Sequence, residues 1–408
     1  MAAVLALGGP AQATTFVDPT FGTDGSVTTD FGGTSDQVIV MAVQPDGKIL
    51  VGGTSSPTAS TQTSIVKIVR YDADGTVDTT FASQGQLTIS YPGESYATID
   101  SMAVQLNGRI LVSTRAFSWT QGYFAAVSRL MPDGTLDPNF SGDGKIAGWF
   151  GQIGVQSNGR ILVFGAKVDN SQQGLVAFHP NGSIDHTFGR DGFAKTPSPG
   201  GETLFRLDLL SVSPSDRILL GGNYGSALAA AEVTRNGFLR TGFGDHGLAT
   251  LDPGGYQTLA YDVGPGLDGG VVVGGSSQDS VPKPRVEGDL VRFTNTGAPD
   301  AGFGTGGLVR RTVPAYTGVV SFATDANGRT VVGLQNSSPN RDFLLARYGL
   351  DGSLDQSFGD MGVINAQLGT NGGSVWPVVI QPDGNILAAG WLSNGSDQDF
   401  AVVRFLLT

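Results

Sequence analysis

A ten-residue pattern recurs seven times in this chain and constrains its fold more than any other feature. Its clearest copy, residues 44–53, is Gln-Pro-Asp-Gly-Lys-Ile-Leu-Val-Gly-Gly. Asp46-Gly47 predicts a two-residue hairpin turn in which glycine takes a positive φ, and Ile49–Val51 predicts a strand that is buried on both faces. The other copies lie at residues 105–114, 156–165, 213–222, 264–275, 325–334 and 381–390.

A second pattern follows each hairpin and is most complete at residues 71–85. A glycine turn ends one strand, an aspartate caps a single helical turn, and an aromatic residue enters the core. Pro19 and Pro138 occupy the first helical position, where a missing N–H is harmless. The core aromatic residues are Phe21, Phe81, Phe140, Phe188, Phe243, Phe303 and Phe358.

Each unit therefore contains four short strands, A to D in chain order. In the first unit they are expected near residues 38–44, 48–53, 64–71 and 86–91. Four strands in roughly 50 to 60 residues is the size of one propeller blade. Ala227–Glu232 has a helix-forming composition, but its position in the four-strand repeat predicts a strand C.

The two ends of the chain predict a closed ring. Ser26–Phe31 is a strand D with no A, B or C before it, and Asp399–Thr408 is a strand C with no D after it. Pairing the two completes one blade and removes the exposed edges. We therefore predict an all-β, seven-bladed β-propeller with four antiparallel strands per blade; an open solenoid would instead carry polar cap repeats.

Composition limits the partners of this propeller. Glycine accounts for 62 of 408 residues and charged residues for 15%, which is typical of a turn-rich all-β protein. The net charge of −12 disfavours nucleic acid and anionic membranes, and cysteine is absent. No stretch is long and apolar enough for membrane insertion. We expect a monomer that binds no nucleic acid.

Residues 1–13 have the apolar core of a secretory signal, followed by an Ala11-Gln12-Ala13 cleavage motif, although a positively charged region is lacking. This segment is expected to be the remnant of a signal peptide, and residues 14–408 a single propeller domain. The predicted location is outside the cell, in the periplasm or in the cell envelope.

The segments Val43–Gly53 and Asp351–Gly359 together resemble the delta-60 repeat family of bacterial β-propeller proteins. The resemblance covers nearly all of residues 14–408 and implies the propeller fold, but it implies little chemistry. Blade 3 departs from the pattern because its D–A connection shrinks to about Trp149-Phe150-Gly151, and blade 4 has Ser213–Asp216 in place of Gln-Pro-Asp-Gly.

The repeated charged residues favour structural roles. Asp72–Asp78 could form a short calcium loop, but its carboxylates vary between blades and no bidentate glutamate follows, so we interpret them as turn caps and expect no metal and no cofactor. Arginine ends strand C in five blades and is expected to reach a turn carboxylate. All three histidines fall in C–D turns, so no catalytic triad is available. The arginines are Arg70, Arg129, Arg292, Arg347 and Arg404.

Asp100 and Asp208 interrupt the apolar pattern of strand A, at the position that Ile39, Leu259 and Val320 hold in other blades. Because strand A is expected to be innermost, both carboxyls should face the central channel. They are either a paired-acid site or solvated channel residues.

The variable connections predict the working face. The A–B and C–D turns are uniform and share one end of the blades, the turn face, whereas the D–A and B–C connections vary and share the other, the loop face. The variable segments are residues 55–63, 116–122, 276–287 and 392–398 between B and C, and 197–202 and 368–373 between D and A. All four tryptophans fall on the loop face: Trp119, Trp149, Trp376 and Trp391.

The predicted function is a binding scaffold whose tryptophans, with Asp100 and Asp208 below them, contact a glycan or a protein. The tryptophans could also simply pack the rim. One alternative is a carboxylate-dependent lyase or hydrolase at the channel mouth, and another is a purely structural module of a surface assembly.

Overall fold

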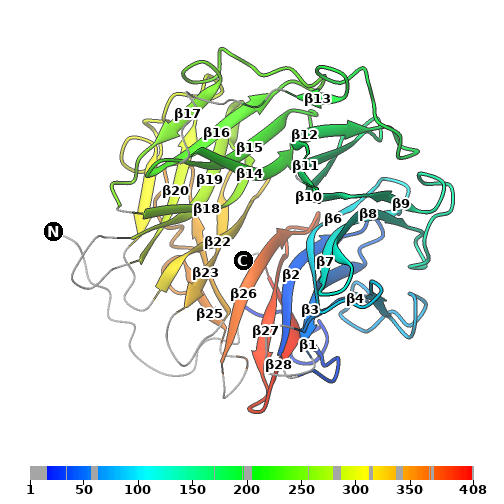
Figure 1. Ribbon diagram of the computed structural model, residues 1–408. Coiled ribbons are helices and arrows are strands. Elements are labelled where there is room, and N and C mark those ends of the chain that lie inside the picture. Colours follow the sequence, from blue (N-terminus) through cyan, green and yellow to red (C-terminus); the bar gives the residue numbers. More distant parts are fainter. Residues whose placement is uncertain are drawn as a thin grey trace.

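The computed structural model describes residues 16–33, 35–56, 63–169, 171–194, 196, 205–255, 257–278, 286–311, 316–336, 343–366, 368 and 372–406. These residues form seven four-stranded antiparallel sheets arranged as blades around a ring (Figure 1). In blades 1 to 6 the strands follow each other in space as they do in the chain, and the first strands of neighbouring blades contact one another all around the ring. The predicted seven-bladed propeller is confirmed.

The strands of the first four blades have the following bounds. Blade 1 contains β2 (Ser35–Val43), β3 (Ile49–Ser56), β4 (Ile65–Tyr71) and β5 (Gln86–Ile89). Blade 2 contains β6 (Tyr96–Val104), β7 (Ile110–Ser118), β8 (Gly122–Leu130) and β9 (Lys145–Ala147). Blade 3 contains β10 (Trp149–Val155), β11 (Ile161–Lys167), β12 (Gln173–Phe178) and β13 (Phe193–Ala194). Blade 4 contains β14 (Phe205–Val212), β15 (Ile218–Tyr224), β16 (Ala227–Val233) and β17 (Leu248–Leu251).

The remaining blades complete the ring. Blade 5 contains β18 (Gln257–Pro265), β19 (Val271–Gln278), β20 (Val286–Phe293) and β21 (Leu308–Arg311). Blade 6 contains β22 (Tyr316–Thr324), β23 (Thr330–Asn336), β24 (Phe343–Tyr348) and β25 (Val363–Ala366). Blade 7 contains β26 (Gly373–Ile380), β27 (Ile386–Ser393), β28 (Gln398–Phe405) and, from the other end of the chain, β1 (Ser26–Thr29). A short 3₁₀ helix, Leu267–Gly269, joins β18 to β19, and no helix among the described residues could cross a membrane.

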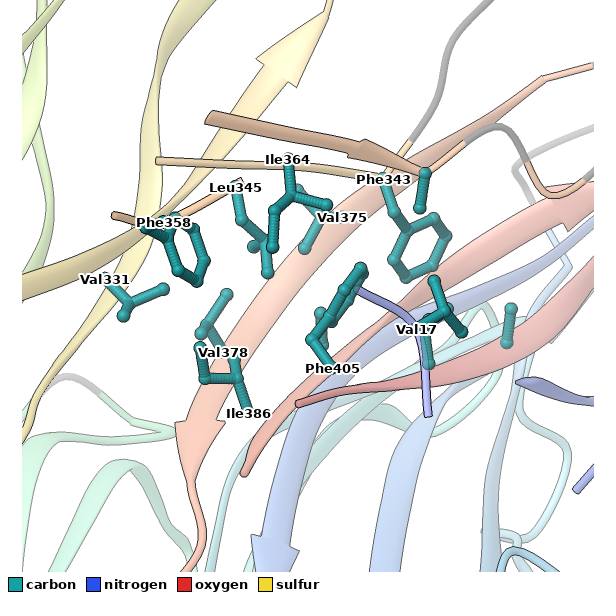
Figure 2. Packing of buried hydrophobic residues seen from close by; sticks show 14 of the residues in the cluster. Val17, Val331, Phe343, Leu345, Phe358, Ile364, Val375, Val378, Ile386 and Phe405 are labelled. Carbon is teal, nitrogen blue, oxygen red and sulfur yellow. The ribbon is translucent and has the colours of Figure 1, made fainter. Parts of the chain in front are cut away.

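The two ends of the chain close the ring within blade 7. β1 pairs with β28, with Ser26 opposite Val403 and Thr29 opposite Phe400. Before β1, Asp18 accepts a hydrogen bond from Arg404 at 2.7 Å, and the backbone of residues 16–18 pairs with that of 404–406. Val17 packs with Phe405 and with apolar residues of blades 6 and 7 (Figure 2). The predicted closure is confirmed.

The turns keep the predicted glycine but differ in length. In the A–B hairpin of blade 1, the Gln44 N–H donates to the Lys48 carbonyl oxygen and closes the loop. The loop contains three residues, whereas the sequence predicted two. Gly47 has φ +87°, as a type I turn followed by a left-handed residue requires. In the C–D turn, Asp78 Oδ1 accepts from the Thr80 N–H as expected of a cap, but the segment is a turn and not a helix.

The arginines that end strand C serve the blades, as the sequence favours. Each pairs at 2.7 to 2.9 Å with the turn aspartate that follows it in the blade and lies 4.3 to 4.7 Å from the centre of the core phenylalanine ring. In blade 4 the charges are exchanged: Glu232 stands where five of the other blades have arginine, and Arg240 replaces the aspartate at 2.8 Å. The ion pair is therefore retained although the residue types are not.

Backbone hydrogen bonds link six of the C–D turns to the next blade. The residue after the core phenylalanine donates its N–H to a carbonyl in the neighbouring C–D turn, as Ala82 does to Asp133 at 2.7 Å. Equivalent bonds start at Gly22, Ser141, Gly189, Gly244 and Gly304. The turn face is thus a nearly continuous hydrogen-bonded belt, which leaves the loop face for variable structure.

Candidate functional site

All innermost strands except β10 of blade 3 carry a β-bulge near their middle. The register shifts at Ile39, Asp100, Asp208, Tyr261 and Val320, each of which is the extra residue. Asp100 and Asp208 therefore do share the position of Ile39 and Val320. In blade 5 the equivalent residue is Tyr261, because the bulge lies two residues later than the sequence alignment at Leu259 placed it.

Asp100 is largely buried and pairs with Arg115 on the neighbouring strand. Its Oδ1 lies 3.0 Å from Arg115 Nε, and the guanidinium stands 5.4 Å from the centre of the Phe150 ring of blade 3. Burial raises the pKa of Asp100 to about 6, although the Arg115 charge acts in the opposite direction. A half-exposed arginine is thus held in place at the loop end of blade 2.

Asp208 belongs to β14 of blade 4, and the innermost strand of blade 3, β10, lies between it and Asp100 (Figure 1). The two carboxyls therefore occupy the same position in the repeat but not the same blade junction. Asp208 is partly buried.

The four tryptophans have different environments. Trp119, in the β7–β8 connection, is 77% exposed, and Trp376, at the bulge of β26, is 40% exposed. Trp391 in β27 is partly buried. Trp149 is only 3% exposed and packs against Phe178 and Phe193 inside blade 3, so it is a core residue and unavailable to a ligand.

The structure adds aromatic residues around Trp119 that sequence reasoning did not select. The Phe117 ring packs edge-on against Trp119 at 4.9 Å and in a tilted arrangement against Tyr123 at 4.8 Å, and Tyr123 is 69% exposed. Phe117 pairs with Tyr96 of the innermost strand, which is also exposed. We call Tyr96, Phe117, Trp119 and Tyr123 the aromatic ridge. Their signal in the sequence is a density of aromatic residues around one B–C loop.

The short blade 3 explains why the aromatic ridge stays uncovered. β7 has nine residues, whereas β11, its counterpart in blade 3, has seven. At about 3.3 Å per residue, blade 2 extends roughly 7 Å farther toward the loop face. Arg115 and Phe117 alternate with buried residues along β7, so their side chains lie on the same side of the sheet. Ser113 lies on this side too, and its hydroxyl accepts a hydrogen bond from the Gly151 N–H of blade 3 at 3.0 Å. This side of the sheet therefore faces blade 3. The ion pair and the ridge therefore lie along one edge.

Asp262, which the sequence did not indicate, joins two blades. It follows the bulge of β18, and its Oδ2 accepts from the Phe322 N–H of β22 at 2.9 Å and from Ser321 at 3.1 Å. Ser101 and Ser321 make the same bond to the next innermost strand through their hydroxyl oxygens. Burial raises the pKa of Asp262 to about 6. It is a structural link and not a site residue.

Asp262 predicts an unusual dependence of stability on pH. In the unfolded chain this carboxyl ionises near 3.8, and in the folded protein near 6. Between these values only the unfolded state releases the proton, so the free energy of unfolding falls as pH rises, by on the order of 3 kcal/mol. Denaturant titrations with chelator present at several pH values should show a shallower slope for Asp262→Asn. An unchanged slope, or an equal effect of Asp46→Asn in an exposed turn, would contradict this.

Parts of the predicted loop face lie outside the described residues. This applies to all of residues 197–202, to 57–62 within the first B–C connection, to 279–285 within the fifth, and to 369–371. On the turn face, a hollow of about 470 Å³ lies between blades 7 and 1. It is lined by Gly22, Thr23, residues 26–28 and residues 75–77, none of which is charged, and so it offers little to orient a ligand.

Five segments of the chain match the family model described as Domain of unknown function (DUF5122) beta-propeller: residues 44–81, 105–140, 156–188, 326–358 and 381–407. The chain is a β-propeller repeat protein. Four of these matches end at the core phenylalanine of the C–D turn, and all begin in or beside an A–B hairpin. The propeller's fourth and fifth repeats lie outside the matched segments. Blade 4 has the exchanged ion pair, and blade 5 has a 3₁₀ helix in its A–B connection.

Solved structures similar to this propeller differ widely in sequence. A polysaccharide lyase of family PL25, an ulvan lyase bound to -[GlcA(1-4)Rha3S]-, has a TM-score of 0.51 at 12% identity, over 92% of this chain and 96% of that chain. A protein of unknown function from Dyadobacter fermentans scores 0.45 at 12% identity, covering 94% and 100%. Drosophila Plexin A in complex with Semaphorin 1b scores 0.43 at 9% identity, covering 93% and 86%. Such identities establish a shared fold alone. None of the curated proteins compared matches the chain.

Proposed function

We propose that this propeller is a carbohydrate-binding scaffold of the bacterial delta-60 repeat type, located outside the cell or in the cell envelope. The observation that supports this most is the aromatic ridge next to the Arg115–Asp100 ion pair, on the loop face of blade 2. Trp119 and Tyr123 expose large apolar surfaces to water, which is unfavourable unless a ligand covers them. Large exposed aromatic groups therefore mark binding surfaces.

The two halves of this site match the two sides of a sugar. The C–H face of a pyranose ring is apolar and stacks on an aromatic ring, and the Phe117 ring contacts the rings of both Trp119 and Tyr123. Arg115 is half-exposed, and Asp100 holds its Nε. Its remaining N–H groups can donate to hydroxyl or carboxylate oxygens of the ligand. Trp376 and Trp391 are proposed as secondary contacts, and Asp208 as part of the same channel wall.

A glycan fits this arrangement better than a protein does. The aromatic ridge is a row of rings next to the Arg115–Asp100 ion pair. Such a surface can stack against sugar rings and make a few oriented hydrogen bonds to their oxygens. The ulvan lyase, which has a similar fold, holds a polysaccharide, and this is compatible with the proposal. A protein ligand would be revealed by binding that is insensitive to competing oligosaccharides.

Replacing Trp119 or Tyr123 by alanine should weaken glycan binding at least tenfold, because each removes one stacking surface. Binding is measured by affinity electrophoresis and calorimetry against a panel of neutral and acidic polysaccharides. Stability should stay within about 1 kcal/mol of the parent, since both side chains are exposed. Phe238→Ala is the matched control: Phe238 is also exposed (59%), but it lies in a C–D turn on the turn face. Failure of the parent to bind any polysaccharide, or equal loss in the control, would refute the proposal.

A carboxylate-dependent lyase or hydrolase is the second candidate, and the raised pKa of Asp100 favours it. A carboxyl with a pKa of about 6 is suited to proton transfer near neutral pH, and Arg115 could neutralise an acidic sugar. It ranks second because Asp100 and Asp208 lie at different blade junctions. Product release from a bound polysaccharide, lost in Asp100→Asn but retained in Asp208→Asn, would place this candidate first.

A further inference from the structure

Three carboxylates that are distant in the sequence meet where the ring closes. Asp30 follows β1, Asp36 lies in β2 of blade 1, and Asp399 lies in β28 of blade 7. One oxygen of each lies within 4.8 Å of the others. Asp36 is fully buried and Asp399 is 9% exposed, while Asp30 is exposed and leaves the group open to solvent. Asp397 is a fourth carboxylate close enough to affect both buried ones.

Few hydrogen-bond donors reach the buried oxygens of this cluster. Asp36 Oδ2 accepts from the Phe31 N–H at 2.9 Å, and Asp399 Oδ2 accepts from Asn394 Nδ2 at 3.2 Å. The other oxygen of Asp399 and Asp397 Oδ1 are buried without a partner among the described residues, and the Ser55 hydroxyl is the side-chain donor beside the second oxygen of Asp36. A carboxylate oxygen shielded from water and left unpaired is costly, so native proteins nearly always pair it.

No positive side chain compensates this charge. In the described part of the chain, none of Asp30, Asp36, Asp397 and Asp399 forms a salt bridge within 4.0 Å. Burial first, and then the neighbouring carboxylates, raise the pKa values of Asp36 and Asp399. Two buried and mutually repelling carboxylates are unfavourable unless something positive lies between them.

Neutral oxygens stand beside the cluster. A Cβ placed on Gly33 would lie 2.7 Å from Ser55 Oγ, 2.8 Å from the Ser56 carbonyl oxygen and 2.9 Å from Asp36 Oδ1. A hydroxyl, a carbonyl and a carboxylate oxygen therefore crowd around Gly33, where any side chain would clash with them. Hard oxygen donors of mixed charge are the ligands of calcium in proteins.

We propose that Asp30, Asp36 and Asp399 bind one calcium ion at the seam where the propeller closes, with Asp397 supplying additional negative charge. Calcium suits the site better than magnesium, because it accepts irregular sets of six to eight oxygens, whereas magnesium needs a near-ideal octahedron. From the sequence, metal ligands were conceivable only in the C–D turns; this site lies at the opposite end of the blades. The ion ties the strand from the beginning of the chain to the strand from its end.

The test measures the melting temperature of the full-length protein, after removal of divalent ions, in chelator and in calcium or magnesium chloride. Calcium at 100 times its dissociation constant should raise the melting temperature by about 3 °C, and magnesium by clearly less. The isosteric variants Asp36→Asn and Asp399→Asn should lose this rise, and Asp74→Asn, in a C–D turn, should keep it. Calorimetry or terbium luminescence should give one ion per chain.

The order of the melting temperatures of parent and variants should also differ between chelator and calcium. In chelator, Asp36→Asn and Asp399→Asn should melt at or above the temperature of the parent, because each removes repulsion between carboxylates; in calcium the parent should melt highest. A parent that does not respond to calcium, a response that survives in both variants, or an equal response to magnesium would overturn the assignment. Variants that melt several degrees lower than the parent even in chelator would show a purely structural role and would also overturn it.

Discussion

Removing residues 16–31 is expected to lower the melting temperature by about 10 °C or more. The deletion takes away β1 from the edge of blade 7, the Asp18–Arg404 ion pair, and the buried side chains of Val17 and Phe21. Losing one buried phenylalanine already costs about 3 to 5 kcal/mol, and the deletion leaves Arg404 without the carboxylate it pairs with. The exposed edge of β28 should also promote association between molecules.

Circular dichroism melts and light scattering measure these two effects. A synthetic peptide of residues 16–31, added in excess, should restore part of the melting temperature if it occupies the vacant edge. The same peptide with Phe21→Ala is the matched control and should rescue less, since Phe21 is completely buried between blades 7 and 1. A deletion protein that melts with the parent would contradict closure by β1.

Replacing Glu232 by arginine is expected to destabilise the protein by about 3 kcal/mol or more, because three arginines would then share one largely buried site. Glu232 is 5% exposed and accepts hydrogen bonds from Arg217 and Arg240 at 2.8 to 2.9 Å. Burial alone would raise the pKa of Glu232, but the bonds from the two arginines outweigh it and leave the pKa below its usual value.

The double variant Glu232→Arg with Arg240→Asp should recover most of this loss. It recreates in blade 4 the arrangement of blade 2, where Arg109 and Arg129 both pair with Asp137. Aspartate at 240 could also accept from the Gly242 N–H, as Asp300 does from Gly302 in blade 5. Denaturant unfolding of the parent, the two single variants and the double variant gives the coupling energy. Additive losses would show that the pair is not interchangeable between blades.

Repeated features could be predicted from the sequence because the same local physics acts seven times. The glycine of the A–B turn, the capping aspartate and the core phenylalanine each depend on neighbours a few residues away. The arginine of strand C has its carboxylate partner eight residues later, as in Arg70 and Asp78, and was predictable for the same reason. The lengths of the turns were less certain, because Gln-Pro-Asp-Gly is compatible with more than one hairpin loop.

The candidate glycan site was only partly predictable. Trp119 is exposed as proposed, but Trp149 is buried because blade 3 folds over it, and Phe117 and Tyr123 gain their exposure from the shortness of the same blade. Exposure depends on what the next blade covers. That is decided by relative strand lengths, which one blade's sequence does not contain.

The sequence alone determined the blade, the number of blades and the closure of the ring, since these follow from local turns, strand periodicity and complementary chain ends. Only the tertiary structure brought together Asp30, Asp36 and Asp399, and set Asp262 against the backbone of the next blade. The physical reason is the same in both cases. A carboxylate's environment depends on residues from other blades, which are unrelated to it in sequence spacing and meet it only when the ring is complete.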